Sequence, residues 1–528
     1  MASSKAINQM LMRIVRRAEM QDEQTLARTF VPIEEIENGL RLIDHQVLYG
    51  RRGTGKTHAL SYLASEVAAG GDLAIYLDLR TIGSSSGLYS DDAEPLSQRG
   101  TRLLIDVLEG IYNDLYERAV LDDRYAGALP FLDALGEAVT RVHVTGPVTV
   151  DDEFEDMRAD DAGHSNGAAL QIPHGQLTLR HDSSAKRSRS TRVRQSIQRS
   201  GDEQYRISFG SLGRALANLC GGLAPARIWL LLDEWSSLPL DLQPLLADML
   251  RRTVFPCRSV TVKIGAIERR SQFFRRTAEA DYLGIELGAD TAAALNLDEH
   301  LIAAESGPRA EAFFSELLYK HLLVLMESLG RELTLASPGD LVRAAFAPGA
   351  MEEFVRAAEG VPRDALNIAG LAAARASDRP VSISDIRVAA RQYYVRDKES
   401  GIAGNDQAQQ LWRRLQRTVV MTGRARTFLL PRRRAGSPKA ILDLYDARLI
   451  HLLQAGLASR DQPGVVFDGY AVDYGSYVQV IEEEEIAAMW DARKRPWEYR
   501  PDGVQLSDRF DDSMIFHITP FNGRKQHK

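Results

Sequence analysis

The chain has 528 residues, 44% of them apolar and 26% charged, a composition typical of a soluble globular protein with room for about three domains. Its 65 basic and 72 acidic residues give a net charge of −7, which excludes a uniformly basic nucleic-acid-binding protein but not a local basic patch. The two cysteines, Cys220 and Cys257, form no CxxC pair, and the chain carries neither a membrane-length apolar run nor a signal-peptide core, so we expect a cytoplasmic protein without a zinc ribbon or a disulfide framework.

The chain begins with predicted amphipathic helices over residues 1–44, and a short strand, Gln46–Tyr49, follows them. One face of the first helical segment carries Ile7, Leu11, Ile14 and Val15. The strand runs into a glycine-rich turn, and a helix is predicted from Lys56 to Ala69. A strand, a glycine-rich turn and a helix in this order are the setting in which a phosphate-binding loop folds.

The turn carries the complete pattern GxxxxGK[ST], from Gly50 to Thr57. Glycines let the backbone curl so that its N–H groups and the helix N-terminus surround phosphate oxygens. Lys56 is predicted to reach the β- and γ-phosphates, and Thr57 to supply an oxygen ligand to Mg²⁺. The predicted nucleotide-binding residues are Gly50, Arg51, Arg52, Gly53, Thr54, Gly55, Lys56, Thr57 and His58. We therefore expect ATP and Mg²⁺ as the cofactors.

A second buried strand, Leu73–Leu79, and a long helical stretch, Arg102–Val142, precede an abrupt change of composition. Residues 151–161 contain seven acids and one base, whereas residues 177–200 contain seven bases and one acid. Few large apolar side chains lie between them, which indicates a mobile or partly ordered polyampholyte insertion over residues 146–205. The basic arm of this insertion could contact nucleic acid, but a solvated loop is the simpler interpretation.

The second strong signal is an apolar strand, Ile228–Leu232, that ends in Asp233 and Glu234. A strand that is apolar on both faces is buried in the middle of a sheet, so carboxylates at its end lie at the rim where open α/β sheets bind ligands. Asp233 is predicted to hold Mg²⁺, usually through water. Glu234 is predicted to orient and polarise the attacking water.

Strands and helices alternate around this motif, with helices at Phe209–Leu219 and Leu242–Arg252 and strands at Ser259–Ile267 and Tyr282–Leu287. Because the strands are apolar on both faces, the pattern predicts an α/β fold with a parallel sheet covered by helices on both faces. Helical segments follow near 310–329, 338–347, 350–358, 362–376 and 383–394. The predicted domains are N-terminal helices (1–44), a P-loop core (45–290), a helical domain (291–400), a C-terminal domain (401–485) and an extension (486–528).

The C-terminal domain has a strongly basic start, because residues 411–435 contain eight arginines and no acid. These are Arg413, Arg414, Arg417, Arg424, Arg426, Arg432, Arg433 and Arg434. A strand at Thr427–Leu430, two helices, of which the second is Ala447–Leu457, and a hairpin of Val465–Tyr470 with Val472–Ile481 follow in the order of a winged helix. Such a fold places a helix in the major groove of DNA, and a basic stretch suits phosphate contacts. The alternative is a winged helix that binds protein, because its second helix offers few side chains that read bases.

Three segments, LYGRRGTGKTHAL, WLLLDEW and EGVPRDALNIAGLAAARA, together resemble the AAA+ ATPases, specifically the origin-recognition or initiator-like clade and its bacterial relatives. The resemblance covers residues 28–485 in order, with 146–205 as an insertion. It implies an ATPase core, an α-helical lid and a C-terminal winged helix. It also implies that Arg363, at the start of a lid helix, is the sensor-2 arginine that contacts the γ-phosphate and completes a catalytic set with Glu234 and Lys56. The alternative is a surface arginine beside a helix start.

The sequence departs from this family at the strand Ser259–Ile267, which should end in a polar sensor-1 residue. Lys263 or Glu268 could serve instead, and the sequence does not decide between them. Four arginines follow where the clade carries the arginine finger that one subunit supplies to its neighbour's nucleotide. They are Arg269, Arg270, Arg275 and Arg276, and they could equally form a solvated helix face.

The leading hypothesis is a Mg²⁺-dependent AAA+ ATPase switch that forms homo-oligomers, binds double-stranded DNA, and loads or regulates an effector protein such as a nuclease or a helicase. By resemblance, bacterial members serve mobile-element or anti-phage defence systems. The competing hypothesis is a signalling ATPase of the STAND class, which the segment Gly360–Arg363 also resembles. Such a protein would bind ATP, oligomerise on a trigger and activate a protein partner without binding DNA.

Overall fold

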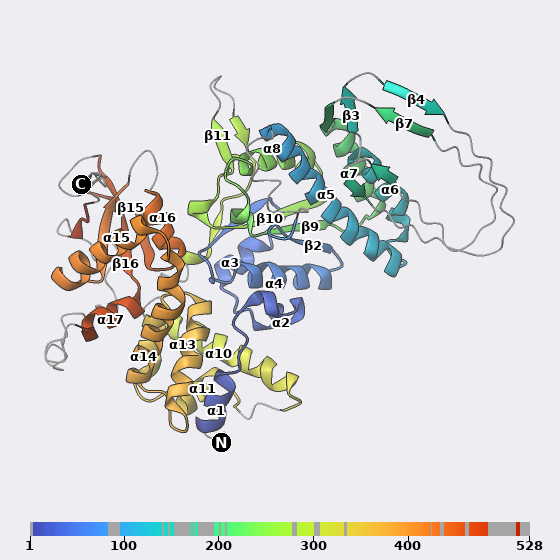
Figure 1. Cartoon of the computed structure of the whole chain (residues 1–528). Coiled ribbons are helices and arrows are strands. Elements are labelled where there is room, and N and C mark those ends of the chain that lie inside the picture. The colour runs from blue at the N-terminus through green and yellow to red at the C-terminus, as the bar shows by residue number, and fades with distance from the viewer. Residues whose placement is uncertain are drawn as a thin grey trace, which may run out of the picture. The chain divides into compact units, whose positions relative to one another are not determined.

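The computed structural model divides the chain into two compact units, one formed by Met1–Val139 with Ser208–Lys528 and the other by Thr140–Ile207 (Figure 1). The described residues are 4–82, 95–139, 208–276, 282–299, 307–331, 335–423, 425–432, 438–459, 464–483 and 514–517, together with six strands of the second unit. Within these residues, no helix combines the length and the apolar character needed to cross a lipid bilayer.

The core of the first unit is a five-stranded sheet in which all neighbouring strands are parallel, so the predicted parallel sheet is confirmed (Figure 1). Its strands, in spatial order, are β13 (Leu295–Asn296), β1 (Gln46–Tyr49), β10 (Val260–Ala266), β9 (Ile228–Asp233) and β2 (Leu73–Asp78). Every residue of β9 and β10 is buried, as their unbroken apolar runs predict. The strand predicted at Tyr282–Leu287 does not join this sheet. Instead, β12 (Tyr282–Gly284) pairs antiparallel with β11 (Phe274–Arg276), which lies a short loop away and offers a local partner.

Helices cover both faces of the sheet, as predicted. Leu231 of β9 packs with Leu60 of α4, and Tyr76 of β2 lies in register with Leu231. Because alternate residues of a strand point to opposite faces, the next residue, Leu77, faces away from α4, and it lies against Gly110 of α5. The helices of this part are α4 (Lys56–Ala69), α5 (Leu96–Leu121), α6 (Leu129–Val139), α7 (Phe209–Gly222) and α8 (Gln243–Thr253). The predicted helical stretch Arg102–Val142 therefore divides into α5 and α6.

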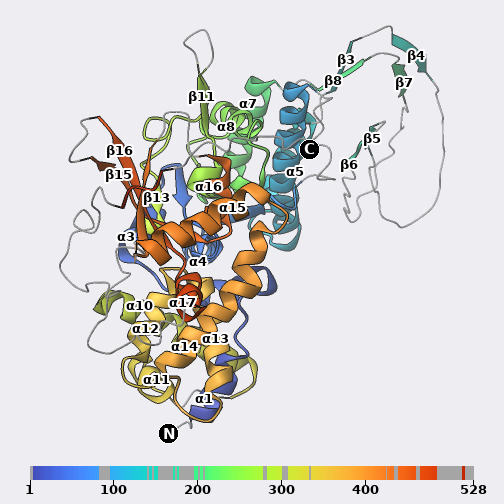
Figure 2. The same ribbon diagram turned by 60° about the vertical axis from the view of Figure 1, so that its left-hand side comes forward.

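The N-terminal segment and the helical domain share one apolar core. Ile7, Leu11 and Ile14 are buried in it with Ala369 of α13, and Figures 1 and 2 both show α1 beside α11 and α13. Val15 lies beyond the end of α1 and is 44% exposed, so it is not part of the predicted apolar face. The N-terminal helices are α1 (Ser4–Leu11), α2 (Glu23–Thr29) and α3 (Glu34–Leu40). The five predicted helical segments, for which the name lid is kept, are confirmed as helices: α10 (Pro308–Ser328), α11 (Pro338–Ala345), α12 (Ala350–Ala358), α13 (Pro362–Ala376) and α14 (Ile383–Tyr393). A π-helical turn extends α14 to Lys398.

The C-terminal domain contains a three-stranded antiparallel sheet flanked by helices. Its strands, in spatial order, are β14 (Thr427–Pro431), β16 (Val466–Val472) and β15 (Ile450–Ala458), and its helices are α15 (Asp406–Leu415), α16 (Lys439–Asp446) and α17 (Tyr474–Glu483). The predicted helix Ala447–Leu457 is wrong: Arg448 adopts a left-handed φ of 59°, which turns the chain into β15. The predicted strand Val472–Ile481 is also wrong, because Asp473 accepts a hydrogen bond from the Ser476 amide at 3.0 Å and starts α17. Among the described residues between β14 and β15, one helix is present rather than the two predicted, so the predicted winged-helix order is not the observed one.

The second unit, Thr140–Ile207, overlaps the predicted insertion and contains three nested antiparallel strand pairs. The pairs are β3 (Val142–Thr145) with β8 (Asp202–Tyr205), β4 (Val148–Asp152) with β7 (Gln195–Arg199), and β5 (Leu170–Ile172) with β6 (Gly175–Leu177). Most of the acidic cluster 151–161 and of the basic cluster 177–200 lies outside the described residues. The same holds for the predicted extension 486–528, of which residues 514–517 are described.

Candidate nucleotide-binding site

The glycine-rich turn between β1 and α4 has a sharply curled backbone. Gly53 and Gly55 have φ angles of +87° and +100°, in the left-handed region that disfavours side chains with a Cβ atom. Gly55 directly precedes the first residue of α4. An anion at this turn would meet backbone N–H groups and the positive end of the α4 dipole together.

Lys56 is buried in this loop, with 7% of its side chain exposed. Its Nζ donates hydrogen bonds to the carbonyl oxygens of Gly50 at 2.8 Å and Arg51 at 3.1 Å, and it forms no ion pair with any described carboxylate. Burial lowers the pKa of Lys56, although the more distant Asp233 and Glu234 act in the opposite direction. A buried cation that is held by carbonyl oxygens alone is suited to meet an anionic ligand.

The two predicted metal-binding residues meet at the end of β9. Thr57 Oγ1 donates a hydrogen bond to Asp233 Oδ2 at 2.6 Å, and the hydroxyl of Tyr76 on β2 donates to the same oxygen at 2.9 Å. The other oxygen of this fully buried carboxylate accepts from the Glu234 amide at 2.8 Å. A hydroxyl and a carboxylate oxygen side by side are hard ligands of the kind that Mg²⁺ takes.

Glu234 directly follows β9, and its backbone turns away from the direction of that strand beside the same site. Its φ of 58° is uncommon for a non-glycine residue, and its side chain lines the cavity beside the loop. Ser237 Oγ lies 3.4 Å from one carboxylate oxygen, and Arg80 Nη1 lies 4.0 Å from the other. The carboxylate is therefore held near the loop by two weak contacts, which leaves it able to bind a further donor.

Arg363 connects the lid helix α13 to the loop. Its amide donates a hydrogen bond to the Gly53 carbonyl at 3.1 Å. A Cβ atom at Gly53 would lie 2.8 Å from the Arg363 Cβ, so only glycine allows this close approach. The guanidinium lines the same cavity, with one nitrogen 4.0 Å from a carboxylate oxygen of Glu19.

A cavity of about 250 Å³ joins these residues. Its polar lining includes Lys56, Thr57, Glu234 and Arg363, which gather two cations, a hydroxyl and a carboxylate around the loop. Its apolar lining comes from the N-terminal segment and the lid, and consists of Phe30, Val31, Ile33, Leu297, Phe313, Leu317 and Leu366. A cleft lined by both charged and apolar side chains fits a ligand that joins phosphates to a planar base.

Two histidines also line this cavity. The rings of His58 on α4 and His321 on α10 lie edge to face, with centroids 6.2 Å apart. Burial lowers the pKa of His58 to about 4 and that of His321 to about 3, so both rings are neutral at pH 7. Within the described residues, His58 Nε2 has no hydrogen-bond partner. The cavity therefore offers a neutral ring nitrogen beside its apolar lining.

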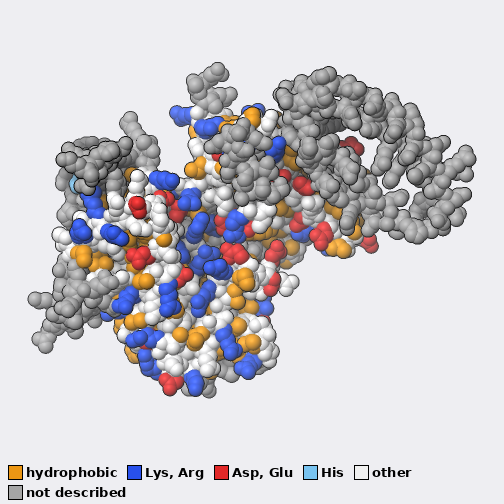
Figure 3. Space-filling model, in the orientation of Figure 1, with side chains coloured by type: hydrophobic (Ala, Val, Ile, Leu, Met, Phe, Trp, Pro, Cys, Tyr) orange, Lys and Arg blue, Asp and Glu red, His pale blue; other side chains and the backbone are white. Residues whose placement is uncertain are grey.

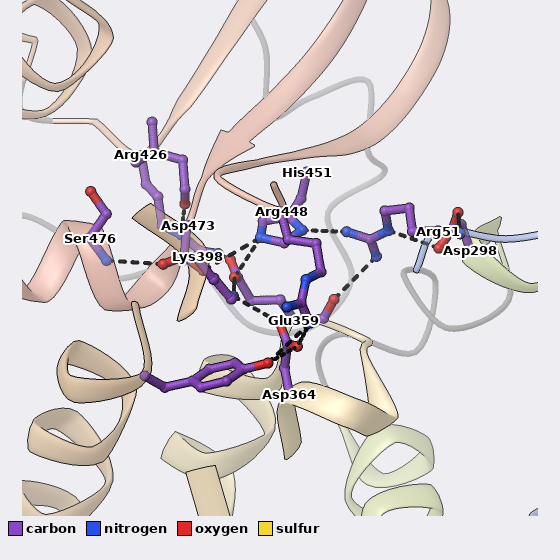
Figure 4. Close-up of polar contacts among 12 residues, drawn as sticks. Arg51, Asp298, Glu359, Asp364, Lys398, Arg426, Arg448, His451, Asp473 and Ser476 are labelled. Atoms are coloured by element: carbon purple, nitrogen blue, oxygen red, sulfur yellow. Dashed lines mark hydrogen bonds and ion pairs between the residues drawn. The ribbon is translucent and has the colours of Figure 1, made fainter. Parts of the chain in front are cut away.

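The two arginines of the loop differ sharply in position. Arg52 is exposed and lines the cavity. Arg51 is 1% exposed and its side chain points away from the cavity, where Nε donates to Asp298 Oδ1 at 2.8 Å (Figure 4). The predicted nucleotide contact of Arg51 is therefore left to its main chain, which belongs to the loop. Thr54 is also internal, since its hydroxyl donates to the Arg51 carbonyl at 2.9 Å.

Neither predicted substitute for sensor 1 lines the cavity. Lys263 is fully buried and its Nζ donates to the Leu42 carbonyl at 2.8 Å and to Gln46 Oε1 at 3.0 Å, at the start of β1 rather than at the loop. Glu268 follows β10 outside the lining. At Gly265 of β10, a Cβ atom would lie 2.6 Å from Asp233 Oδ1, so this strand presents no side chain beside that carboxylate.

The four candidate finger arginines fall into two pairs. Arg269 binds Asp468 at 2.8 Å, and Arg270 binds Asp446, so both bind acids of the C-terminal domain of the same chain. Arg275 and Arg276 lie on β11 and are exposed. The structure therefore leaves the second pair accessible to another molecule.

The basic stretch of the C-terminal domain is only partly exposed. Arg426 forms an internal ion pair with Glu359, and Arg414 donates to the His517 carbonyl at 2.7 Å. The exposed members among the described residues are Arg413, Arg417 and Arg432, whereas Arg424, Arg433 and Arg434 lie outside the described residues. On the face in Figure 3, Lys and Arg side chains occur in several groups with Asp and Glu side chains between them.

Sequence reasoning missed three residues of the site, namely Tyr76, Arg80 and Glu19. Arg80 follows β2 and contacts Glu19 at 3.1 Å and Asp78 at 2.6 Å. The carboxyl ends of parallel strands meet at one edge of a sheet, so the end of β2 could have been placed beside Asp233 from the sequence. No comparable signal marks Glu19, which arrives from the N-terminal segment.

The comparisons with known proteins show a distant likeness to solved structures. No protein-family model matches the sequence, and no curated protein matches it significantly. Among solved structures, the chain is similar to the ORC1 protein of Aeropyrum pernix in complex with DNA, with 13% sequence identity and a TM-score of 0.32. This match covers 89% of the chain and 98% of that structure. The likeness is too weak to carry a functional conclusion, which has to come from the geometry of the site.

Proposed function

We propose that this chain binds ATP with Mg²⁺ and hydrolyses it, as an ATPase switch of the AAA+ type. The observation that carries the proposal is the 2.6 Å contact between Thr57 Oγ1 and Asp233 Oδ2, made at the loop that holds the buried Lys56. Two motifs 176 residues apart in the sequence thus converge on one cavity that is lined by both charged and apolar side chains. A structural turn needs neither the acid nor the buried lysine.

The residues present fit both ATP and Mg²⁺. Thr57 and Asp233 offer adjacent hydroxyl and carboxylate oxygens and would hold Mg²⁺. Mg²⁺ at that position would neutralise charge on the β- and γ-phosphates. The loop amides and Lys56 would bind the phosphate oxygens, once Lys56 exchanges its carbonyl partners for them. The apolar lining, with Phe30 and Leu366, would take the base.

Glu234 is the residue placed to act on water. Its carboxylate would accept a hydrogen bond from the attacking water and take up its proton as the bond to the γ-phosphorus forms and the bond to the bridging oxygen breaks. Arg363 would face the γ-phosphate and couple its charge to the position of the lid, because the same residue binds the loop through Gly53. Arg80 would hold Glu234 in place, from 4.0 Å in the structure.

Two variants of the full chain test the ATPase proposal. Lys56→Ala is expected to weaken ATP binding on the order of 10- to 100-fold, because a charge-assisted hydrogen bond to phosphate is lost. Glu234→Gln is expected to keep ATP binding and to lower turnover about 10²- to 10⁴-fold. Equilibrium binding and phosphate release measure the two effects, with Lys439→Ala on an exposed part of α16 as the control. Normal turnover in Glu234→Gln would overturn the assignment of the catalytic residue.

Self-assembly and DNA binding are the further parts of the proposal. Exposed Arg275 and Arg276 are available to a neighbouring subunit, and the exposed Arg413 and Arg417 on the C-terminal domain are available to phosphates. In such an assembly, hydrolysis would report contact with a neighbour, and the switch would load or regulate an effector protein. The competing signalling switch is supported by Arg269 and Arg270, which bind the C-terminal domain of their own chain and hold the molecule closed on itself.

DNA binding separates these two forms of the proposal. The double variant Arg413→Ala/Arg417→Ala is expected to weaken binding of double-stranded DNA of any sequence, and to reduce the slope of log affinity against log salt by about two. Arg124→Ala/Arg343→Ala removes the same charge from exposed positions elsewhere and serves as the control. If the wild-type chain binds no DNA and its ATP turnover ignores DNA, the signalling form takes the place of the DNA-binding form.

A further inference from the structure

Arg51 is a residue of the phosphate-binding loop whose side chain is bound by three distant parts of the chain (Figure 4). Nε donates to Asp298 Oδ1 at 2.8 Å, Nη2 donates to the Glu359 carbonyl at 3.3 Å, and Nη1 bonds to Nδ1 of His451. Its amide also donates to Asp298 Oδ2 at 2.8 Å. Asp298 follows β13, Glu359 precedes the lid helix α13, and His451 belongs to β15 of the C-terminal domain.

The bond from Arg51 fixes the state of His451. An arginine is always a donor, so Nδ1 of His451 must accept, and the ring proton must lie on Nε2. Nε2 lies 2.7 Å from Glu359 Oε2 and 3.6 Å from Asp473 Oδ2. The ring thus lies between the loop arginine and the carboxylates of Glu359 and Asp473. The same Glu359 carboxylate pairs with Arg426 of the C-terminal domain.

This chain of contacts belongs to a larger buried network with balanced charge (Figure 4). Its four cations and four carboxylates are Arg51, Lys398, Arg426, Arg448, Asp298, Glu359, Asp364 and Asp473. Lys398 Nζ lies 2.8 Å from Asp364 and also pairs with Asp473. The members come from the P-loop core, the lid and the C-terminal domain, so the network joins all three.

A metal site is a different interpretation of part of this network. Glu359, His451 and Asp473 present ligand atoms within 4.8 Å of one another, and all three are buried. The carboxylates among them are already paired with Arg426 and Lys398, however, and a further cation would have to displace one of these charges or share their oxygens. The geometry therefore favours an ion-pair network without a metal.

We infer that Arg51 is a positioning residue, which sets the shape of the phosphate-binding loop through its contacts with the C-terminal domain and thereby couples nucleotide binding to the docking of that domain. The coupling has a direct route, because the Arg51 carbonyl accepts hydrogen bonds from Lys56 Nζ and from Thr54. The inference rests on the proposed function of the loop. It goes beyond that function by assigning the C-terminal domain a role in nucleotide binding.

Coupling of this kind is reciprocal. If docking of the C-terminal domain shapes the loop, then a nucleotide in the loop must stabilise the docked domain by the same factor. Backbone amides of β15 and of residues 359–364 are thus expected to exchange with solvent more slowly when nucleotide is bound. Coupling factors between sites are typically about 5- to 150-fold, and we expect a change on the order of tenfold.

Hydrogen exchange on the full chain tests this expectation, with a non-hydrolysable ATP analogue and Mg²⁺ as the ligand. In the wild-type chain, the analogue is expected to slow exchange in β15, although no residue of β15 lines the cavity. In Arg51→Met, the slowing is expected to vanish and ATP affinity to fall on the order of tenfold. Arg343→Met, which removes an exposed lid arginine that pairs with Asp340, is expected to behave as wild type.

Variants of His451 test whether the effect passes through this ring. His451→Leu removes the acceptor for Arg51 and is expected to match Arg51→Met, whereas His451→Asn keeps an acceptor near the Nδ1 position and is expected to restore most of the affinity. If both residues act through one contact, the double variant Arg51→Met/His451→Leu binds ATP no more weakly than Arg51→Met alone. A purely structural role would instead lower affinity in proportion to the loss of stability in every variant.

The outcomes separate the inference from the function on which it rests. A wild-type chain that binds the analogue without any change in β15 overturns the coupling and leaves the ATPase proposal standing. A wild-type chain that does not bind the analogue overturns both. Should Arg51→Met fail to fold, Arg51→Lys and the wild-type exchange measurement still decide the question, because the latter needs no substitution.

Discussion

Two buried lysines of this chain differ in the groups that their side-chain nitrogens contact. Lys398, between the lid and the C-terminal domain, is 2% exposed and pairs with the carboxylates of Asp364 and Asp473. Lys56, in the phosphate-binding loop, is almost as deeply buried but bonds to carbonyl oxygens alone. Burial lowers the pKa of Lys56, whereas the neighbouring carboxylates outweigh burial and raise the pKa of Lys398.

The difference separates a charge that the fold uses from a charge that awaits a ligand. Carboxylates in contact with Lys398 neutralise it in the folded chain, so that this lysine contributes to the structure itself. Lys56 has a cavity in front of it and no paired carboxylate among the described residues. A buried cation without a counter-ion costs stability, and an anionic ligand that binds to it offsets this cost. The comparison can be tested at either lysine.

The largest expected effect is the loss of Lys398. Lys398→Met leaves two buried carboxylates short of a partner, and breaking a buried pair in this way costs about 3–5 kcal/mol of the free energy of unfolding. Lys56→Met is the matched control, because it removes a lysine of similar burial that has no paired carboxylate among the described residues. We expect it to leave the free energy of unfolding unchanged or higher, while ATP binding weakens on the order of 10- to 100-fold.

Chemical denaturation of both variants, without nucleotide, measures these effects. If both substitutions lower the free energy of unfolding by the same amount, the proposed difference between the two lysines is wrong, because Lys56 would then stabilise the fold as Lys398 does. An unchanged unfolding midpoint in Lys398→Met would show that the network adds no net stability.

The contrast also explains what the sequence could predict. The loop residues Gly53 to Thr57 are neighbours in the chain and follow a strand, so their spacing alone predicts their arrangement. Asp233 and Glu234 were placed at the same edge because carboxyl ends of parallel strands meet there. The network offers no such signal: the side-chain partners of Arg51 lie 247, 308 and 400 residues away along the chain.

The C-terminal domain shows a second limit of sequence reasoning. A short run rich in Leu and Ile, such as Ala447–Leu457, has no periodicity that separates a buried helix from a buried strand. In the structure, the left-handed turn at Arg448 and the pairing of β15 with β16 decide for a strand. Because β16 lies later in the chain, the sequence of Ala447–Leu457 alone does not reveal this pairing. That strand then brings His451 to Arg51, so the same segment that was misassigned carries the unforeseen contact.

The smallest expected effect is on the pH dependence of the free energy of unfolding. Burial lowers the pKa of His451 in the folded chain to about 3, against about 6.5 in an unfolded chain, so the unfolded state binds more protons below pH 6.5. Stability is therefore lost as the pH falls below 6.5 towards the folded pKa. For this one ring, the loss between pH 7.5 and pH 5 amounts to about 2 kcal/mol.

His451→Asn removes this titration and keeps an acceptor for Arg51, so its stability is expected to fall less steeply with acid than that of the wild-type chain. The cavity histidines, His58 and His321, also have lowered pKa values and are present in both proteins, so the difference between the two pH profiles isolates the network. Identical profiles would mean that His451 is not held neutral by the fold. The hydrogen bond from Arg51 to this ring would then be wrong, since a protonated ring cannot accept from an arginine.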